Sequence, residues 1–229
     1  MVSAIIVAAG KGIRMNSGTR KQYIAVAGRP ILGHTLHKFD ACDRIDIIYL
    51  LVPEADFDHC RKSVLSTINP NKPIRLVAGG AERQDSVYNG LLALEEKSGL
   101  VVIHDGVRPL IQPDLIASCI QGAMKTGACI AGIPAFDTIK QADDTGTIEK
   151  TLSREGLWLA QTPQVFRYDL IREAHDRALR EDFHGTDDAI LVERLGHFVT
   201  IINGSKTNIK ITTEEDLVVA ETLLEEESA

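Results

Sequence analysis

The chain has 229 residues, 44% of them apolar, so it is long enough to bury one substantial hydrophobic core as a single domain, residues 1–229. Its 25 lysines and arginines are outnumbered by 32 aspartates and glutamates, which gives a net charge of −7 at pH 7. This balance argues against a protein that binds a nucleic-acid backbone, because such binding depends on many contacts between basic side chains and phosphates. A small anionic ligand fits the composition better.

The cysteines and the apolar runs indicate where the protein works. Cys42, Cys60, Cys119 and Cys129 show no C-x-x-C spacing, so neither a zinc cluster nor a redox pair is indicated. We expect them to be buried thiols in a reducing cytosol. The N-terminal run lacks the basic region of a signal peptide, and no run approaches the ~20 apolar residues that a membrane span needs. The sequence predicts a cytoplasmic protein without a membrane partner.

Short apolar runs alternate along the chain with helical patterns. Several of the runs are apolar on both faces, as the central strands of a parallel sheet are. We expect strands over residues 3–9, 45–52, 74–79, 99–105, 128–134, 197–202 and 208–212, and helices over residues 30–39, 85–97, 113–125 and 212–227. This alternation predicts an α/β fold: a doubly wound, mostly parallel, Rossmann-like sheet with helices on both faces.

Two helix starts carry capping signals. Thr212 and Glu215 have the spacing of a capping box before the last helix, whose residues Leu217, Ala220 and Leu224 form one apolar stripe. Farther upstream, the pair at residues 187–188 is expected to cap a helix rather than to act in catalysis.

The segment from about Phe136 to Gly156 breaks the alternation. Two half-polar runs flank the turn signal at residues 143–146, so this segment is expected to form a β-hairpin. It holds too few apolar residues to pack into the core. We therefore expect a dimerisation arm that lies on a partner subunit in a homodimer.

The loop after the first strand concentrates positive charge. The first 30 residues contain five lysines and arginines and no acidic residue, and four of the five lie in this loop: Lys11, Arg14, Arg20 and Lys21. A P-loop motif is absent, and Met15 stands where the third glycine of a dinucleotide fingerprint would fall. The remaining interpretations are a solvated basic loop, or a glycine loop whose backbone approaches a nucleotide while Arg14 and Lys21 reach its phosphates.

Two other expected strands end in polar groups, at the edge of the sheet where α/β proteins bind ligands. Asp105 ends one strand and is followed by Gly106 and Arg108, and Gly79 and Gly80 end another, with Arg83 and Ser86 beyond them. A carboxylate in this position suits Mg²⁺, which is usually held by one or two carboxylates together with substrate phosphates. The alternative is an aspartate that caps a turn.

Seven motifs occur in one order along the chain: VAAGKGIRM…KQY, GGAERQDSV, HDGVRP, DTIK, SREGLW, QTPQ and NIKIT. In this order they resemble the 2-C-methyl-D-erythritol 4-phosphate cytidylyltransferases, and the resemblance extends from Val2 to about Leu224. It implies transfer of CMP from CTP to the 4-phosphate of methylerythritol, with Mg²⁺ as cofactor and pyrophosphate as the second product. The implied nucleophile is a phosphate monoester, largely a dianion at neutral pH, so it needs no general base.

The resemblance also implies residue roles. Arg14 and Lys21 would stabilise the transition state, and Asp105 would hold Mg²⁺. The methylerythritol phosphate would be bound by Asp105, Arg108, Thr138, Arg154, Thr162 and Lys210, of which Arg154 and Lys210 would also take part in catalysis. CTP would be bound by Ala8, Ala9, Gly10, Gly12, Gly79, Gly80, Arg83, Ser86 and Gly106, with backbone groups and the Ser86 hydroxyl reading the cytosine.

Three alternatives stay open from the sequence. Ribitol 5-phosphate cytidylyltransferases share several of these motifs, but they tend to begin with an AGG loop, where this chain has Ala8, Ala9 and Gly10. A nicotinamide oxidoreductase is disfavoured by the missing third glycine. A nucleotide-sensing module without catalytic activity would bind CTP and release no pyrophosphate.

Overall fold

A seven-stranded sheet forms the centre of the molecule, and six of its strands are parallel to one another. The computed structural model describes residues 1–10, 20–95, 97 and 99–228. The sheet has the order β11-β7-β10-β6-β1-β4-β5, and β10 alone runs antiparallel to its neighbours β6 and β7. The strands are β1 (Val2–Val7), β4 (Ile47–Val52), β5 (Ile74–Ala78), β6 (Leu100–Asp105), β7 (Ala128–Pro134), β10 (Trp158–Arg167) and β11 (Thr200–Asn203). The predicted doubly wound, mostly parallel sheet is confirmed.

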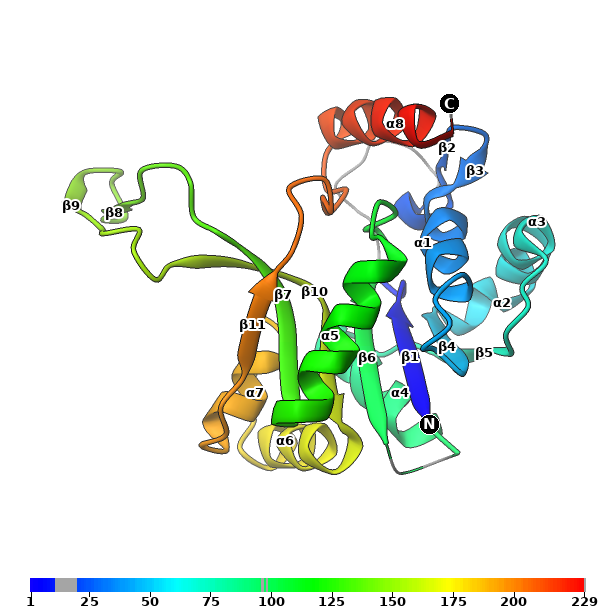
Figure 1. Cartoon of the computed structure of the whole chain (residues 1–229), viewed down its shortest axis with the longest axis horizontal. Coiled ribbons are helices and arrows are strands. Elements are labelled where there is room, and N and C mark those ends of the chain that lie inside the picture. Colours follow the sequence, from blue (N-terminus) through cyan, green and yellow to red (C-terminus); the bar gives the residue numbers. More distant parts are fainter. Residues whose placement is uncertain (11–19, 96, 98, 229) are drawn as a thin grey trace.

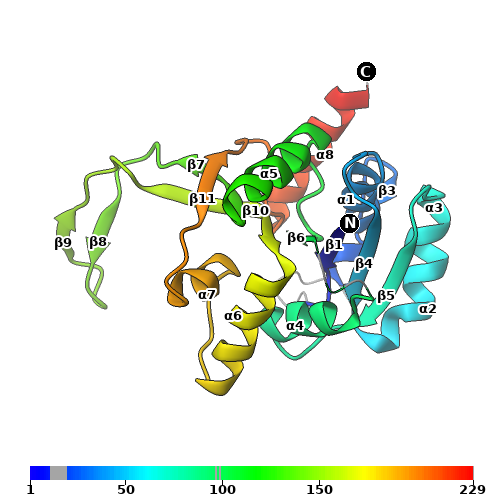
Figure 2. The same ribbon diagram turned by 60° about the horizontal axis from the view of Figure 1, so that its bottom comes forward.

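Helices cover both faces of this sheet (Figures 1 and 2). One face packs against α1 (Ile31–Asp40) and α5 (Pro113–Thr126), and the other against α4 (Arg83–Ala93), α6 (Tyr168–Arg180) and α7 (Ala189–Arg194). The remaining elements are η1 (Lys21–Tyr23), β2 (Ala25–Val26), β3 (Arg29–Pro30), η2 (Glu54–Asp56), α2 (Phe57–Cys60), the π-helical turn η3 (Arg61–Leu65), α3 (Ser66–Ile68) and α8 (Glu214–Ser228). The apolar spacing along each of the predicted helices therefore reflects burial against the sheet or, for α8, against a third, smaller cluster.

One predicted strand is absent from the structure, and one long strand of the structure was not predicted. Residues 208–212 were expected to form a strand, but they belong to no sheet, and Ile211 is instead buried beneath α8 with its N–H donated to the carbonyl of Val107 (2.9 Å). The long strand β10 was not expected, because Pro163 and its polar neighbours have the composition of a loop. Two of those neighbours, Gln161 and Gln164, are buried in β10 with their amides bonded to nearby loops, which compensates for burying them.

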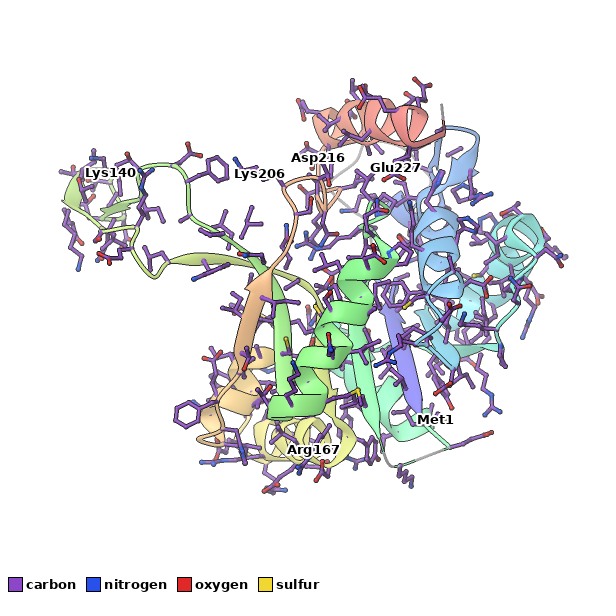
Figure 3. All side chains as sticks on the ribbon, viewed as in Figure 1. Met1, Lys140, Arg167, Lys206, Asp216 and Glu227 are labelled. Carbon is purple, nitrogen blue, oxygen red and sulfur yellow. The ribbon has the colours of Figure 1, made fainter. Side chains whose placement is uncertain are left out.

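The predicted hairpin is confirmed, and it projects away from the sheet as an arm (Figure 1). Its strands β8 (Lys140–Ala142) and β9 (Ile148–Thr151) pair antiparallel, and every residue in them is exposed. Figure 3 places Lys140 on this arm, far from the body of the molecule. Large apolar side chains on the arm and at its base, including Phe136 and Ile148, are also exposed.

Two further expectations concern the cysteines and the membrane. All four cysteines are buried and unpaired, as predicted. In the part of the chain that the structure describes, none of the helices has both the length and the apolar character needed to cross a bilayer.

The capping box of α8 is shifted by one residue from the predicted pair, Thr212 and Glu215. The carboxylate of Asp216 accepts the N–H groups of Thr212 (2.7 Å) and Thr213 (2.9 Å), and the Thr213 hydroxyl accepts the N–H of Asp216 (3.4 Å). Figure 3 places Asp216 at the start of this helix. The expected stripe is nevertheless correct, because Ala220 and Leu224 are buried and Leu217 packs beside them.

Replacing Asp216 with alanine should therefore lower the free energy of unfolding by about 1–2 kcal/mol, because it removes the acceptor for these N–H groups. Urea unfolding monitored by circular dichroism measures the loss. Glu215→Ala is the matched control and should change the stability by less than about 0.5 kcal/mol. Equal losses in the two variants would contradict the observed cap.

Candidate active site

A cavity of about 370 Å³ opens at the carboxyl ends of the central strands. Four segments of the described chain reach it: the loops that follow β1, β5 and β6, and the segment between β11 and α8. The predicted site residues that line it are Ala8, Ala9, Gly10, Lys21, Gly80, Arg83, Ser86, Asp105 and Lys210. Ligands of open α/β sheets bind at this edge, so the position of the cavity agrees with the sequence prediction.

Glycines allow these loops to lie directly against one another. A Cβ atom on Gly79 would collide with the side chain of Ala9, and one on Gly80 would collide with Asp85. The Ser86 hydroxyl accepts the N–H of Gly80 (2.9 Å) and is 2.9 Å from the carbonyl oxygen of Glu82, to which it donates. Ser86 therefore anchors the glycine turn. Gly106, behind the cavity, has Ala8 and Leu32 where a Cβ would project.

The carboxylate of Asp105 lines the cavity and lies among three cations. Its Oδ1 accepts a hydrogen bond from Nε of Arg83 (3.0 Å), its Oδ2 is 2.8 Å from Nζ of Lys210, and Nε of Arg108 is 3.8 Å away. Burial by itself would raise the pKa of Asp105, but the charges of Arg83 and Lys210 outweigh it and hold this pKa well below its usual range. Asp105 is therefore ionised at neutral pH.

A hydrogen-bond chain behind Asp105 fixes its backbone. The Asp105 N–H is donated to Oγ1 of Thr162 (3.2 Å), which lies 3.0 Å from Nδ1 of His104, and the other ring nitrogen of His104 is 3.3 Å from the carbonyl oxygen of Arg108. A carbonyl only accepts, so we assign the ring proton to Nε2, and Nδ1 then accepts the Thr162 hydroxyl. Arg108 also donates Nη1 to the carbonyl of Asn208 (2.7 Å), two residues before Lys210.

The remaining predicted residues lie away from the cavity or outside the described part of the chain. Thr138 and Arg154 are exposed on the arm, and Nη1 of Arg154 donates to the carbonyl of Phe136 within the arm. Gly12 and Arg14 belong to residues 11–19, outside the described residues. Within the described ranges, the structure contains no cluster of three or more histidines, cysteines and acidic residues that could by itself hold a metal.

Two residues of this region were missed from sequence. Gln22 lines the cavity with its side chain 3% exposed, and its Nε2 donates to the carbonyl of Ala8 (2.8 Å). Its place beside Lys21 in the KQY motif was the one available signal. Asp188 was expected to cap a helix, but its side chain pairs with Arg83 instead (2.7 Å). The carboxylate that caps α7 is that of Asp187, which accepts the N–H of Ile190 (3.1 Å).

Close glycine turns and cations gathered around a carboxylate, together in one cavity, are typical of an α/β enzyme that acts on a nucleotide phosphate. The comparisons with known proteins identify the class more narrowly as a nucleotidyltransferase. Residues 2–226 match the 2-C-methyl-D-erythritol 4-phosphate cytidylyltransferase family, and the chain belongs to this family.

Two curated relatives and one solved structure illustrate the similarity. The 2-C-methyl-D-erythritol 4-phosphate cytidylyltransferase of Syntrophotalea carbinolica is 50% identical over 98% of this chain and 96% of its own length. That of Pelotomaculum thermopropionicum is 48% identical over 97% and 94%. The crystal structure of the 4-diphosphocytidyl-2C-methyl-D-erythritol synthase of Anaerococcus prevotii superposes with a TM-score of 0.87 at 36% identity, covering 98% of this chain and 96% of that one.

The buried histidine behind the site predicts a particular pH dependence of stability. Burial lowers the pKa of His104 from 6.5 to about 3, with the charge of Asp105 opposing the shift only in part. The unfolded chain therefore takes up a proton first as the pH falls. The stability that neutral His104 supplies is complete above about pH 6.5 and is lost between there and pH 3, with a slope of at most about 1.4 kcal/mol per pH unit.

Urea unfolding at several pH values between 7 and 5 measures this slope. The His104→Gln variant should show a flatter dependence of stability on pH than the wild type. His197→Gln, which changes an exposed histidine, should keep the wild-type slope. Parallel curves for the wild type and His104→Gln would show that His104 does not titrate differently in the two states.

Proposed function

We propose that the cavity is the active site in which this chain transfers CMP from CTP to the 4-phosphate of 2-C-methyl-D-erythritol. The phosphate monoester oxygen attacks the α-phosphorus of CTP, the bond from that phosphorus to the bridging oxygen breaks, and pyrophosphate leaves. The products are 4-diphosphocytidyl-2-C-methyl-D-erythritol and pyrophosphate. The observation that carries the proposal is that glycine turns and cations from separate segments line one cavity.

The glycine turns would recognise cytosine. Residues 8–10 and Gly80 line the cavity, with Gln22 holding the carbonyl of Ala8 and Ser86 holding the N–H of Gly80. Gly79 immediately precedes Gly80 in the same turn. Donors and acceptors held in this way discriminate strongly, because a base with the wrong edge leaves buried groups unpaired. Gly12, outside the described residues, and Gly106 are the other residues that would bind CTP.

The cations would act on the phosphates. Lys21 and Lys210 line the cavity, and with Arg14 they would stabilise the negative charge that develops on the α-phosphoryl group and on the leaving pyrophosphate. Lys210 and Arg108 would also bind the methylerythritol phosphate. Thr162 contributes through the backbone of Asp105, which it holds in place.

Asp105 fits the role of a Mg²⁺ ligand. It is an ionised carboxylate that lines the cavity, and Mg²⁺ commonly takes one or two carboxylates with the remaining ligands from substrate phosphates and water. When bound, the ion would neutralise charge on the phosphates of CTP. The same carboxylate now pairs with Lys210, so it would be shared between this lysine and the ion.

The arm suggests that the working unit is a homodimer. Thr138 and Arg154 lie on an exposed arm that projects from the body of its own chain. Exchange of arms across a two-fold axis would cover the exposed apolar side chains of the arm and bring these two residues to the cavity of the neighbouring subunit. Each active site would then take Lys21, Asp105 and Lys210 from one chain and Arg154 from the other.

The function is tested by measuring pyrophosphate release from CTP with 2-C-methyl-D-erythritol 4-phosphate and with ribitol 5-phosphate in parallel. We expect turnover with the methylerythritol phosphate. Faster turnover with ribitol 5-phosphate would contradict the substrate assignment. Binding of CTP without release of pyrophosphate in the presence of either acceptor would indicate a sensing module.

Lys210→Ala should lower kcat at least ~10²-fold, the scale of losing one preorganised electrostatic group, with a smaller change in KM. Steady-state kinetics with both substrates varied measures the two constants. Lys206→Ala is the matched control, since Lys206 lies on the same loop and faces the ring of Phe136 at the base of the arm (Figure 3). A change in KM alone would limit Lys210 to substrate binding.

Mixed dimers test whether Arg154 serves the partner's site. Chains carrying Lys210→Ala, refolded together with chains carrying Arg154→Ala, should recover activity, because each mixed dimer contains one intact site. With random pairing the ceiling is about a quarter of the wild-type activity. Lys150→Ala, an exposed change on the same arm, should leave activity intact. If activity does not recover although mixed dimers have formed, Arg154 acts in the active site of its own chain or in neither site.

A further inference from the structure

Asp188 is a buried carboxylate that none of the roles above uses. It lies at the start of α7, and its side chain is 1% exposed. Its Oδ2 accepts a hydrogen bond from Nη1 of Arg83 (2.7 Å), and its Oδ1 is 3.2 Å from Nε2 of His175. An ionised carboxylate this deep in a protein is costly unless it is paired, so its position calls for an explanation.

The first turn of α7 does not depend on this carboxylate. Asp187 caps the N–H of Ile190, and the side-chain carbonyl of Gln164 accepts the N–H groups of Asp188 and Ala189 (3.1 Å each). The backbone at the start of the helix is therefore satisfied by other groups. The Asp188 carboxylate is directed instead toward Arg83.

Arg83 is held between two carboxylates. Its Nη1 bonds to Asp188 and its Nε to Oδ1 of Asp105, while its Nη2 is buried and finds no hydrogen-bond partner among the described residues. A guanidinium facing one carboxylate prefers two parallel hydrogen bonds, which Nε and Nη2 could form with Asp105. That arrangement would occupy both oxygens of Asp105, including Oδ2, which is now paired with Lys210 (2.8 Å).

We propose that Asp188 is a positioning residue for the cytidylyltransferase reaction. By holding Nη1 of Arg83, it limits the guanidinium to one hydrogen bond with Asp105, from Nε to Oδ1. Oδ2 of Asp105 then stays available to Lys210. Asp188 thus sets the place of a catalytic lysine through two intermediate side chains. The inference rests on the proposed function of Lys210 and Asp105.

The charges of the cluster support this role. Arg83, Arg108 and Lys210 surround Asp105, and Asp188 is a second carboxylate that contacts one of them, Arg83. Without Asp188, three cations would face one carboxylate, and Arg83 would be drawn fully onto it. The backbone of Arg83 is held in place, because Arg83 is the first residue of α4, whose start is fixed by the capping box of Glu82 and Asp85. Only its guanidinium would shift.

The test compares four variants with the wild type: Asp188→Asn, Arg83→Gln, the double variant with both changes, and Asp187→Asn as the matched control. The measurements are kcat, KM for CTP and the thermal midpoint of each protein. Asp188→Asn should lower kcat about 10- to 100-fold, the scale of a small misplacement of a catalytic group. KM for CTP should stay within about threefold of the wild-type value, because the Asp188 carboxylate bonds to Arg83 and His175 and not to the backbone groups or the Ser86 hydroxyl proposed to read the base.

The double variant decides whether Asp188 acts through Arg83. Its kcat should equal that of Arg83→Gln within about twofold, since Asp188 has nothing left to position once Arg83 is gone. Asp187→Asn should keep wild-type kcat. If Asp188→Asn does not fold, the comparison of the double variant with Arg83→Gln still applies, because the double variant buries no unpaired charge.

Three outcomes would overturn the inference: an unchanged kcat in Asp188→Asn, an added loss of the same size in the Arg83→Gln background, or an equal loss in Asp187→Asn. A loss confined to KM for CTP would overturn it as well. Failure of this inference is distinguishable from failure of the proposed function. If the wild-type chain turns over CTP and methylerythritol phosphate, the function is upheld whatever the result for Asp188→Asn.

Discussion

The burial of an ionised carboxylate at the end of a central strand is the constraint on which the site depends. Asp105 is 6% exposed, and a charge in that position must be compensated by nearby cations. The cations come from three places that are distant in sequence: the start of α4, the turn after β6 and the segment before α8. Placing Asp105 therefore also determines where these three segments meet, and it leaves the cluster with more positive than negative charge.

The site combines neutral backbone groups and charged side chains for a physical reason. Backbone N–H and carbonyl groups of the glycine turns can be brought close to a flat base only where no Cβ intervenes, as at Gly79 and Gly80. Phosphates need long charged side chains that reach them from separate elements. A nucleotide would use both kinds of group, and Gln22 and Ser86 keep the neutral groups rigid by holding their backbone.

The arm follows a different logic from the rest of the chain. Its two strands bury nothing against their own subunit, so its polar composition is compatible with folding, but its exposed apolar residues, Phe136 and Ile148, are unfavourable unless another surface covers them. A polar hairpin is suited to a contact between subunits because it stays soluble before assembly. In the homodimer proposed above, Arg154 on this arm would act only after assembly.

The amino-acid pattern within short segments determined the alternation of strands and helices and the hairpin. It also determined which strand ends carry Gly80, Asp105 and the basic loop. Hydrophobic periodicity and turn residues are properties of short segments, so they can be read from the sequence by itself. Motif order carried the family and the identities of Lys21 and Lys210. Only the tertiary structure decided what depends on distant partners. It buried the polar strand β10 by satisfying Gln161 and Gln164, it kept residues 208–212 out of the sheets by bonding Ile211 to Val107, and it turned Asp188 from a cap toward Arg83. Each of these outcomes depends on a hydrogen bond or ion pair between residues at least 24 apart in the chain, which no local pattern encodes.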